Sequence, residues 1–402
     1  MLAFLNHLLG CFFYKVCKVV LVKDKLMYEI RNFELIFVKL IFTISCLAVH
    51  SSTYSADDWI QENYITGYLS SGNFPVRKFQ PSSTPSLFLF KKQTELDEKI
   101  AIEITSNFQK SSFNLSLLLI ENGEIVLELY KSGLSSKNKF FSYSMSKSLT
   151  AKTVGYALCN GFLTSLNELA GDISSSLKGN VFGLATVEQL LTMTSGARPP
   201  DQEGGSLSGE WNDVTRGISS ITEILNRYGK EQTNAGNFVY NNSNTNALML
   251  TIEGRTNFGD LFEKNIWIKS MPESEATWLI DKNKKIYAAA GFGATLRDWG
   301  RLATHALAMR NGSEGACIES YMRNATQLLV TDNQKKRYFG YGYQTWISPI
   351  QRSEIFLWQG AYGQKVIFDP RQNKIMILFR NKEEENILKD FFMSFNKWRG
   401  FN

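Results

Sequence analysis

The body of this sequence carries strand-type patterns near both of its ends and helix-type patterns in between. Leu115–Tyr130 contains two apolar runs around Asn122-Gly123, a pair whose backbone tolerates the positive φ of a tight hairpin turn. Residues 144–310 are dominated by helical periodicity. The other expected elements are strands at Phe339–Ile347, Ile355–Phe368 and Lys374–Phe379, and helices at Glu95–Gln109 and Glu383–Trp398. This order predicts an α/β fold of the α+β type: one antiparallel sheet from both ends, flanked by helices, with an inserted helical subdomain at about 160–310 and a cleft between the two parts.

Composition and charge exclude several classes of protein. The 402 residues are 44% hydrophobic, which is ample for a packed core. The formal charge is +6, but residues 1–56 hold six basic and three acidic side chains, so the rest of the chain is only +3. No basic run is interleaved with aromatic residues, and nucleic-acid binding is therefore not expected.

The N-terminus has the pattern of a targeting segment. Leu40–Val49 is a run of ten apolar or small residues that follows two basic positions, and small and polar residues come after it. We interpret residues 1–56 as an upstream extension plus a signal peptide that starts at Met27 and is cleaved between His50 and Asp57. Residues 57–402 would then be exported to the periplasm or secreted. The alternative is an uncleaved segment that associates the protein with a membrane.

The body of the chain holds two cysteines, Cys159 and Cys317. Their spacing matches no metal-binding motif. We expect two buried, small apolar side chains, and the sequence leaves open whether they pair.

Histidines are scarce, and this limits the chemistry. The chain has His7, His50 and His305, so only His305 lies in the predicted body. It falls in a helix-type stretch and reads as an ordinary half-buried helical residue. A multi-histidine metal site is excluded, no organic cofactor is implied, and hydrolytic chemistry would need another base.

A Ser-x-x-Lys motif, formed by Ser144 and Lys147, could supply a base for hydrolysis. On a helix, residues three apart share a face, so the amine can reach the hydroxyl. Burial and a helix N-terminus both favour a neutral, basic amine, and the Ser144 N–H could donate to an oxyanion. The same spacing recurs at Ser136/Lys139, Ser175/Lys178 and Ser394/Lys397. Ser144 differs because it precedes a long helix-type stretch, Ser148–Leu158, shortly after the hairpin.

Tyr240 and Asn242 form the only Tyr-x-Asn in the sequence. A tyrosine beside a Ser–Lys pair can relay the proton to the leaving group, and the Asn amide can hold the substrate carbonyl. The alternative is a polar loop that caps the helix running through Leu250.

Trp358-Gln359-Gly360-Ala361 lies on a late strand-type stretch. A glycine in a strand costs stability unless a ligand or another backbone must come close. We expect an edge strand that lines the cleft and donates a second oxyanion hydrogen bond from the Ala361 amide. A bulge or bend is the alternative.

In this order, the three motifs resemble those of the serine β-lactamase and penicillin-binding superfamily. Its class C-type branch, with the β-lactamase-fold esterases and 6-aminohexanoate-dimer hydrolases, is the most similar over about residues 95–400. Supporting stretches are Gly171-Asp172, Thr186–Gly196 and Ala289–Asp298. The resemblance implies Ser144 as nucleophile, Lys147 as base and Tyr240 as proton relay. It also implies Asn242 as a substrate contact, with the Ser144 and Ala361 amides as oxyanion hole.

One departure bears on the substrate. Where β-lactamases and D,D-peptidases carry Lys-Thr-Gly, this chain has Trp358-Gln359-Gly360, as in the esterase branch. We expect Trp358 and Gly360 to contact the substrate, and the Trp358 ring to favour uncharged acyl groups. The sequence shows no clear counterpart of the extra substrate-contacting tyrosine of the 6-aminohexanoate-dimer hydrolases. Trp211 is either a stand-in for that tyrosine or simply a packed aromatic.

These features predict a serine hydrolase that cleaves a small ester or amide through an acyl-enzyme. The rival enzyme is a β-lactamase or D,D-peptidase acting on cell-wall-like substrates. A non-catalytic binding protein on the same scaffold is the other alternative.

Overall fold

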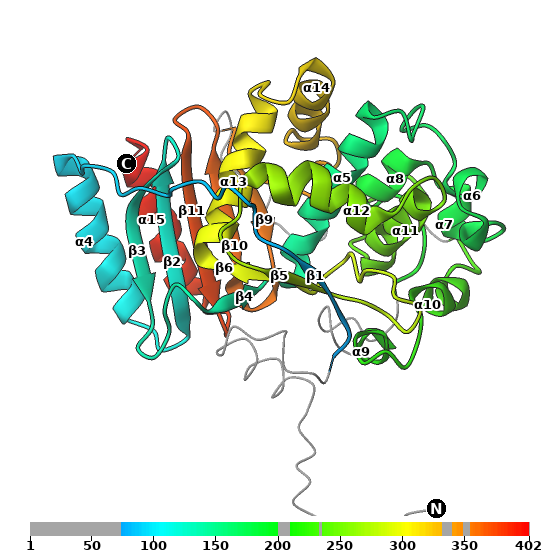
Figure 1. Ribbon diagram of the computed structural model, residues 1–402, viewed down its shortest axis with the longest axis horizontal. Helices are drawn as coiled ribbons and strands as arrows, with labels where there is room; N and C mark the ends of the chain where they lie inside the picture. Colours follow the sequence, from blue (N-terminus) through cyan, green and yellow to red (C-terminus); the bar gives the residue numbers. More distant parts are fainter. Residues whose placement is uncertain (1–73, 200–209, 233–234, 332–339, 349–353, 402) are drawn as a thin grey trace, which may run out of the picture. The chain divides into compact units, whose positions relative to one another are not determined.

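The computed structural model describes residues 74–199, 210–232, 235–331, 340–348 and 354–401 (Figure 1). The predicted signal peptide or anchor and the boundary at 56/57 lie outside these ranges and stay predictions. Among the described helices, none combines the length and the apolar composition needed to cross a membrane.

The larger sheet of the described residues has seven antiparallel strands in the order β3-β2-β11-β10-β9-β8-β7. Its strands are β2 (Asn114–Glu121), β3 (Glu124–Tyr130), β7 (Gly340–Tyr341), β8 (Trp346–Ile347), β9 (Phe356–Gln359), β10 (Lys365–Asp369) and β11 (Lys374–Arg380). The β2–β3 hairpin turns at Asn122 and Gly123, with φ of 52° and 82°. β2 pairs directly with β11, so the predicted sheet from both ends of the body is confirmed. The predicted strands Phe339–Ile347 and Ile355–Phe368 are each split in two by a turn.

Alternation along the strands divides the sheet between two cores. On β11, Met376 and Leu378 face one core together with helices α4 (Glu95–Gln109) and α15 (Glu385–Trp398). Ile375 and Ile377 face the other core, which contains the helices of the middle of the chain. Figure 1 shows α4 and α15 beside β2 and β3, and the middle helices gathered on the opposite side.

The middle of the chain is helical, as expected. Its longest helices are α5 (Ser146–Cys159), α11 (Asn242–Glu253), α13 (Leu296–Arg310) and α14 (Ala316–Ala325). Shorter helices are α6 (Ala170–Ile173), α7 (Val181–Leu184), α8 (Val187–Leu191), α9 (Glu210–Thr215), α10 (Ile221–Tyr228) and α12 (Phe258–Phe262).

A second sheet corrects the prediction of a single one. In the described part of the chain it has four strands in the order β1-β5-β6-β4. They are β1 (Val76–Phe79), β4 (Lys139–Phe141), β5 (Ala276–Leu279) and β6 (Phe292–Thr295). Strands of three or four residues are too short to show an alternating pattern, so sequence periodicity missed them. β4 leads directly into the segment that holds Ser144.

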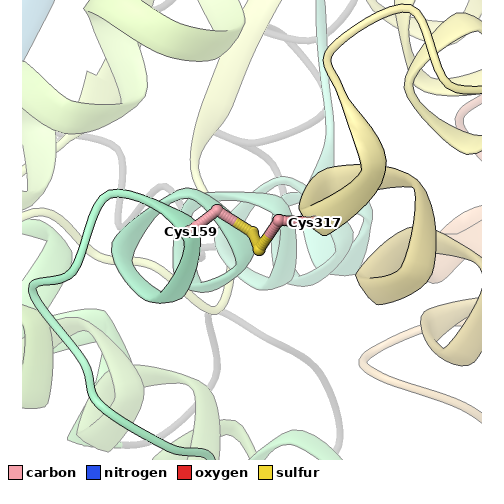
Figure 2. Close-up of a disulfide and its surroundings, with 2 residues drawn as sticks. All are labelled: Cys159 and Cys317. Atoms are coloured by element: carbon pink, nitrogen blue, oxygen red, sulfur yellow. A yellow bond between two sulfur atoms is a disulfide. The ribbon is translucent and has the colours of Figure 1, made fainter.

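The two body cysteines are bonded, which answers the question of pairing that the sequence left open. A disulfide joins Cys159, the last residue of α5, to Cys317 in the first turn of α14 (Figure 2). Their Cα atoms are 5.8 Å apart, although 158 positions separate them in sequence. The pairing depends on the packing of α14 against α5, which sequence spacing does not report.

Replacing both cysteines by serine is expected to destabilise the fold markedly. Cross-linking removes conformational entropy from the unfolded chain, and closure of a loop of this length is worth up to about 5 kcal/mol. Denaturant unfolding of the oxidised protein and of Cys159→Ser/Cys317→Ser measures the difference. Equal unfolding midpoints for the two would contradict a native disulfide.

Candidate active site

Ser144 lies in a tight turn between β4 and α5. The turn is a 3-10 segment, Tyr143–Met145, and Tyr143 has a φ of 43°, in the left-handed region that a bulky residue adopts only under constraint. The constraint is visible: the Ser142 and Ser146 hydroxyls are 2.6 Å apart, and the Phe292 N–H of β6 reaches both. Ser144 itself is partly exposed. The second sheet therefore holds the backbone of this turn and leaves Ser144 partly accessible to solvent.

Lys147 is the second residue of α5 and is 1% exposed. Its Nζ is 2.9 Å from Ser144 Oγ, 2.6 Å from Asn242 Oδ1 and 2.9 Å from the carbonyl oxygen of Ala289. A neutral amine can donate to the last two and direct its lone pair at the Ser144 hydroxyl. This is the geometry required for a base that accepts the serine proton.

The Tyr-x-Asn motif, at the start of α11, also lies next to Lys147. Asn242 is the first residue of that helix, and the Tyr240 ring centre is 5.0 Å from Lys147 Nζ. The Tyr240 ring stacks on Trp346 of β8 at 5.5 Å. The expected cap is also present, but Asn241 provides it by accepting from the Ser243 N–H. The residue between the two motif positions makes the cap, and the motif residues themselves turn toward Lys147.

In the third motif, the backbone at Gly360 packs closely against the backbone that leads into the Tyr143–Met145 turn. A Cβ on Gly360 would stand 2.5 Å from the carbonyl oxygen of Ser142, so only glycine permits this approach. Ala361 begins a 3-10 turn, Ala361–Gly363, in which Tyr362 has a φ of 60°. The rings of Tyr362 and Tyr143 are 5.1 Å apart. The two expected oxyanion donors, the amides of Ser144 and Ala361, thus each adjoin a tyrosine in the left-handed region.

Two expectations about this strand are corrected. β9 is not an edge strand, since it pairs with β10 and also with β8 at Phe356 and Leu357. Trp358 is 0% exposed, so its ring does not present a face to a substrate. The ring lies under Lys152 of α5, 4.1 Å from Nζ, because this side of β9 packs against α5.

A cation does lie beside the motif, on the neighbouring strand. Lys365 of β10 pairs in register with Gln359 and donates to its Oε1 at 2.9 Å. Lys365 is 2% exposed, so its ammonium is not displayed on the surface. Sequence reasoning considered only the residues of the motif strand and missed it.

Lys152 is a second buried amine of α5, two turns beyond Ser144. Burial lowers its pKa to about 7, and the described residues include no carboxylate paired with it. Its Nζ donates to the Ser148 carbonyl at 3.2 Å. The Trp358 ring attracts the charged form and so acts against the effect of burial.

The stability of the protein is therefore expected to rise with pH above 7. Between pH 7 and 10.5 the unfolded chain keeps the Lys152 proton that the folded chain releases, so raising the pH favours the folded state. The increase from pH 7 to 9 should be about 2 kcal/mol. Urea unfolding of the parent and of Lys152→Met at both pH values isolates this residue. A difference between the two proteins that does not change with pH would contradict the assignment.

His305 and Trp211 lie in structural settings. His305, on α13, is buried with Nε2 3.4 Å from Glu314 Oε1, and burial lowers its pKa. Trp211 of α9 is buried and stacks on Tyr287 at 5.3 Å. The packed-aromatic interpretation of Trp211 fits, and its ring is not positioned as a surface contact for substrate.

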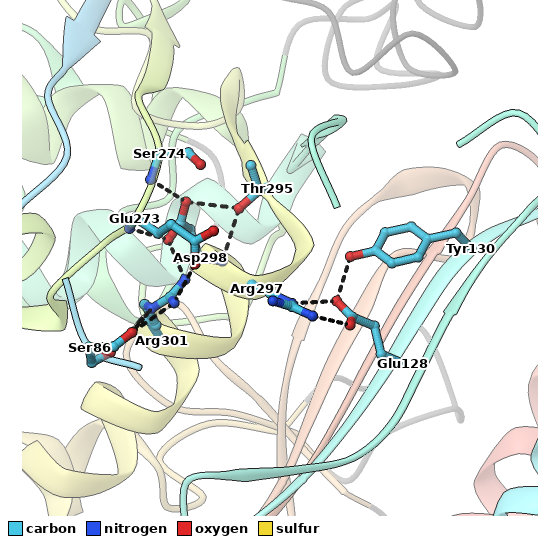
Figure 3. A network of polar contacts seen from close by, with 9 residues as sticks. All are labelled: Ser86, Glu128, Tyr130, Glu273, Ser274, Thr295, Arg297, Asp298 and Arg301. Atoms are coloured by element: carbon cyan, nitrogen blue, oxygen red, sulfur yellow. Dashed lines mark hydrogen bonds and ion pairs between the residues drawn. The ribbon is translucent and has the colours of Figure 1, made fainter. Parts of the chain in front are cut away.

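The stretch Ala289–Asp298 contributes to the site at one end and to the scaffold at the other. Ala289 supplies the carbonyl at Lys147. Asp298, whose pKa burial raises, accepts from the N–H groups of Glu273 and Ser274 (Figure 3). Arg297 binds Glu128 of β3 through two hydrogen bonds of 2.9 and 2.8 Å. This polar network ties α13 to the larger sheet and does not reach the Ser144 hydroxyl.

No group of three or more potential metal ligands occurs among the described residues. The chemistry that the described side chains support is nucleophilic attack by a serine hydroxyl activated by a buried lysine. A fold with one large antiparallel sheet, a helical part and a Ser-x-x-Lys at the start of a central helix defines the class of β-lactamase-fold serine hydrolases.

Comparison with known proteins agrees with this class. Residues 101–389 match the family described as Beta-lactamase, and the chain belongs to that family. A 6-aminohexanoate-dimer hydrolase from Paenarthrobacter ureafaciens is 22% identical over 286 residues, which cover 65% of this chain and 71% of the relative.

Solved structures share the fold. One is a Bacillus anthracis protein provisionally named a 6-aminohexanoate-dimer hydrolase, with a TM-score of 0.71 and 19% identity, covering 87% of this chain and 97% of the other. Another is EstCE1, a hydrolase with promiscuous acyltransferase activity, with a TM-score of 0.59 and 13% identity, covering 76% and 99%. A penicillin-binding protein from Bacillus halodurans has a TM-score of 0.57 and 16% identity, covering 73% and 99%. The chain is thus a hydrolase of the β-lactamase fold.

Proposed function

We propose that this protein hydrolyses uncharged ester or amide bonds through an acyl-enzyme formed on Ser144. The contact that carries the proposal is the 2.9 Å separation of Lys147 Nζ and Ser144 Oγ, with the amine fixed from behind by Asn242 and Ala289. Two of the three other Ser-x-x-Lys lysines form ion pairs instead: Lys139 with Glu275, and Lys397 with Glu103.

The proposed acylation step follows from these contacts. Ser144 Oγ attacks the substrate carbonyl carbon as its proton passes to Lys147. The carbonyl oxygen becomes an oxyanion that accepts from the Ser144 and Ala361 amides. The bond to the leaving group then breaks, and the proton passes through the Tyr240 hydroxyl to that alcohol or amine. A water molecule, deprotonated by the same groups, attacks the acyl ester and releases the acid and Ser144.

The proposed preference for uncharged acyl groups rests on the position of cations. Trp358 stands where β-lactamases and D,D-peptidases carry a lysine, and it is buried. The neighbouring Lys365 is buried as well, and one of its hydrogen bonds is made to Gln359. The relative named 6-aminohexanoate-dimer hydrolase supports amides among the substrates to be tested.

Short-chain activated esters are expected to have a higher kcat/KM than penicillins or cephalosporins. A missing charge-assisted hydrogen bond to a β-lactam carboxylate costs roughly 1.5–3 kcal/mol, or about ten- to a hundredfold in affinity. Purified protein assayed with p-nitrophenyl esters, linear amides and a chromogenic cephalosporin gives the comparison. Lys365→Met serves as a matched variant, because it should leave ester turnover in place. Efficient cephalosporin hydrolysis by the parent would promote the β-lactamase assignment.

Covalent labelling separates an enzyme from a binding protein. A fluorophosphonate reacts readily only with an activated serine, so the parent should be labelled at Ser144. Labelling by penicillin without ester turnover would instead favour a D,D-peptidase. Absence of any labelling would support a binding protein on the same scaffold.

We propose that the protein works outside the cytoplasm. The Cys159–Cys317 disulfide supports this location, because structural disulfides persist in oxidising compartments. N-terminal sequencing of exported protein tests it, and an intact N-terminal extension of residues 1–26 would overturn cleavage of a signal peptide.

A further inference from the structure

Gln364 is a buried amide with no hydrogen-bond partner at either end. It is 0% exposed, and neither Oε1 nor Nε2 is paired with any of the described residues. A buried amide of this kind loses the hydrogen bonds that it makes with water in the unfolded chain. Native structures rarely leave both ends of an amide unsatisfied, and an internal water is the usual partner.

The Gln364 amide lies beside the Tyr143–Met145 turn, which holds Ser144 and is called the nucleophile turn below. The Gly360 N–H donates to the Gln364 carbonyl at 2.9 Å, so the two residues face each other across the turn between β9 and β10. At the point where a Gly360 side chain would begin, the Ser142 carbonyl oxygen is 2.5 Å away and Gln364 Cβ is 3.1 Å away. The Gln364 side chain therefore starts next to the backbone that precedes Ser144.

A second unpaired donor lies on the same side of the strands. Val366 is opposite Trp358 in the β9–β10 register, and alternation puts Gln364 on the same face as Val366. The Trp358 Nε1–H is buried and also lacks a partner among the described residues. This face packs against α5, which carries Lys147 and follows directly on the turn that holds Ser144. Buried polar atoms without a hydrogen-bond partner among the described residues thus lie between α5 and strands β9 and β10.

We propose that Gln364 binds an internal water that ties the Ala361–Gly363 turn to the nucleophile turn, which makes it a positioning residue for the two oxyanion amides. A water both donates and accepts, so it satisfies Nε2 and Oε1 and can donate to the second lone pair of a nearby carbonyl. Tyr143 and Tyr362 hold left-handed backbone on either side of this point, and such conformations persist only when the surroundings over-determine them. The hydrogen bonds of Gln364 and its water would be among the contacts that hold Tyr143 and Tyr362 in these conformations. The role of positioning residue rests on the proposed function, whereas the water itself does not.

A crystal structure of the unmodified protein at about 1.5 Å resolution is the direct test. We expect ordered density within hydrogen-bonding distance of both amide atoms of Gln364. This readout needs no turnover, so it is independent of whether the protein hydrolyses esters. Well-defined density for the side chain without such a water would overturn the proposal, whatever any variant does.

Kinetics of Gln364→Met test the positioning role. The change keeps the length of the side chain and removes its polar atoms, so the water is lost and the oxyanion amides shift. We expect kcat for an ester to fall on the order of tenfold while KM changes by less than about twofold. Ser116→Ala is the matched control, because it removes a buried, unpaired hydroxyl on β2, and its kcat should be unchanged. A Gln364→Met protein that is more stable than the parent and retains its kcat would refute the role.

Discussion

Ser144→Ala is expected to abolish both fluorophosphonate labelling and ester turnover. In the proposed mechanism the Ser144 hydroxyl oxygen forms the acyl bond, so its removal should reduce kcat by at least about 10⁴-fold. The fold should persist, because the hydroxyls that pin the turn belong to Ser142 and Ser146. Labelling followed by mass spectrometry, with a steady-state assay, measures the loss, and circular dichroism checks the fold.

The other serines with the same spacing are the controls for this experiment. Ser136 and Ser175 are exposed, and their replacement by alanine should leave turnover unchanged. If Ser144→Ala kept more than trace activity while one of these variants lost it, the assignment of the nucleophile would be wrong.

Lys147→Met is expected to lower kcat by about 10²–10⁴-fold, the usual contribution of a positioned general base. Methionine keeps the packing of the side-chain stem but cannot accept the Ser144 proton. Lys152→Met is the matched control on the same helix, because that amine is also buried but is bonded to the Ser148 carbonyl. His305→Ala should likewise cost little. A larger loss for His305→Ala than for Lys147→Met would reveal a histidine-dependent mechanism.

Much of the fold could be predicted from local pattern. The β2–β3 hairpin follows from apolar runs around Asn122-Gly123, and helix α4 from its amphipathic period, since both elements are determined by residues close in sequence. The four-stranded sheet was missed because three- and four-residue strands carry too little pattern. It nevertheless decides where Ser144 stands, since β6 pins the turn that follows β4.

The predicted site residues come together only in part. Ser144, Tyr240 and Asn242 converge around the Lys147 side-chain nitrogen, although up to 98 positions separate these residues in the chain. Trp358 does not join them. The sequence shows an aromatic residue at this position. Because side chains alternate along β9 and α5 packs on this side, the Trp358 ring points into the core.

The sequence by itself was sufficient to predict the chemistry that we propose for this protein. A Ser-x-x-Lys at a helix start, a single Tyr-x-Asn, and one histidine in the body indicated a lysine-activated serine, because residue type and helical spacing are local properties. The tertiary structure alone decided which groups surround that pair. The Ala289 carbonyl behind Lys147, the Cys159–Cys317 bond, Lys365 beside Gln359 and the buried Gln364 amide depend on contacts between segments far apart in the chain. Such contacts follow from how helices and strands pack, and no local pattern in the sequence records them.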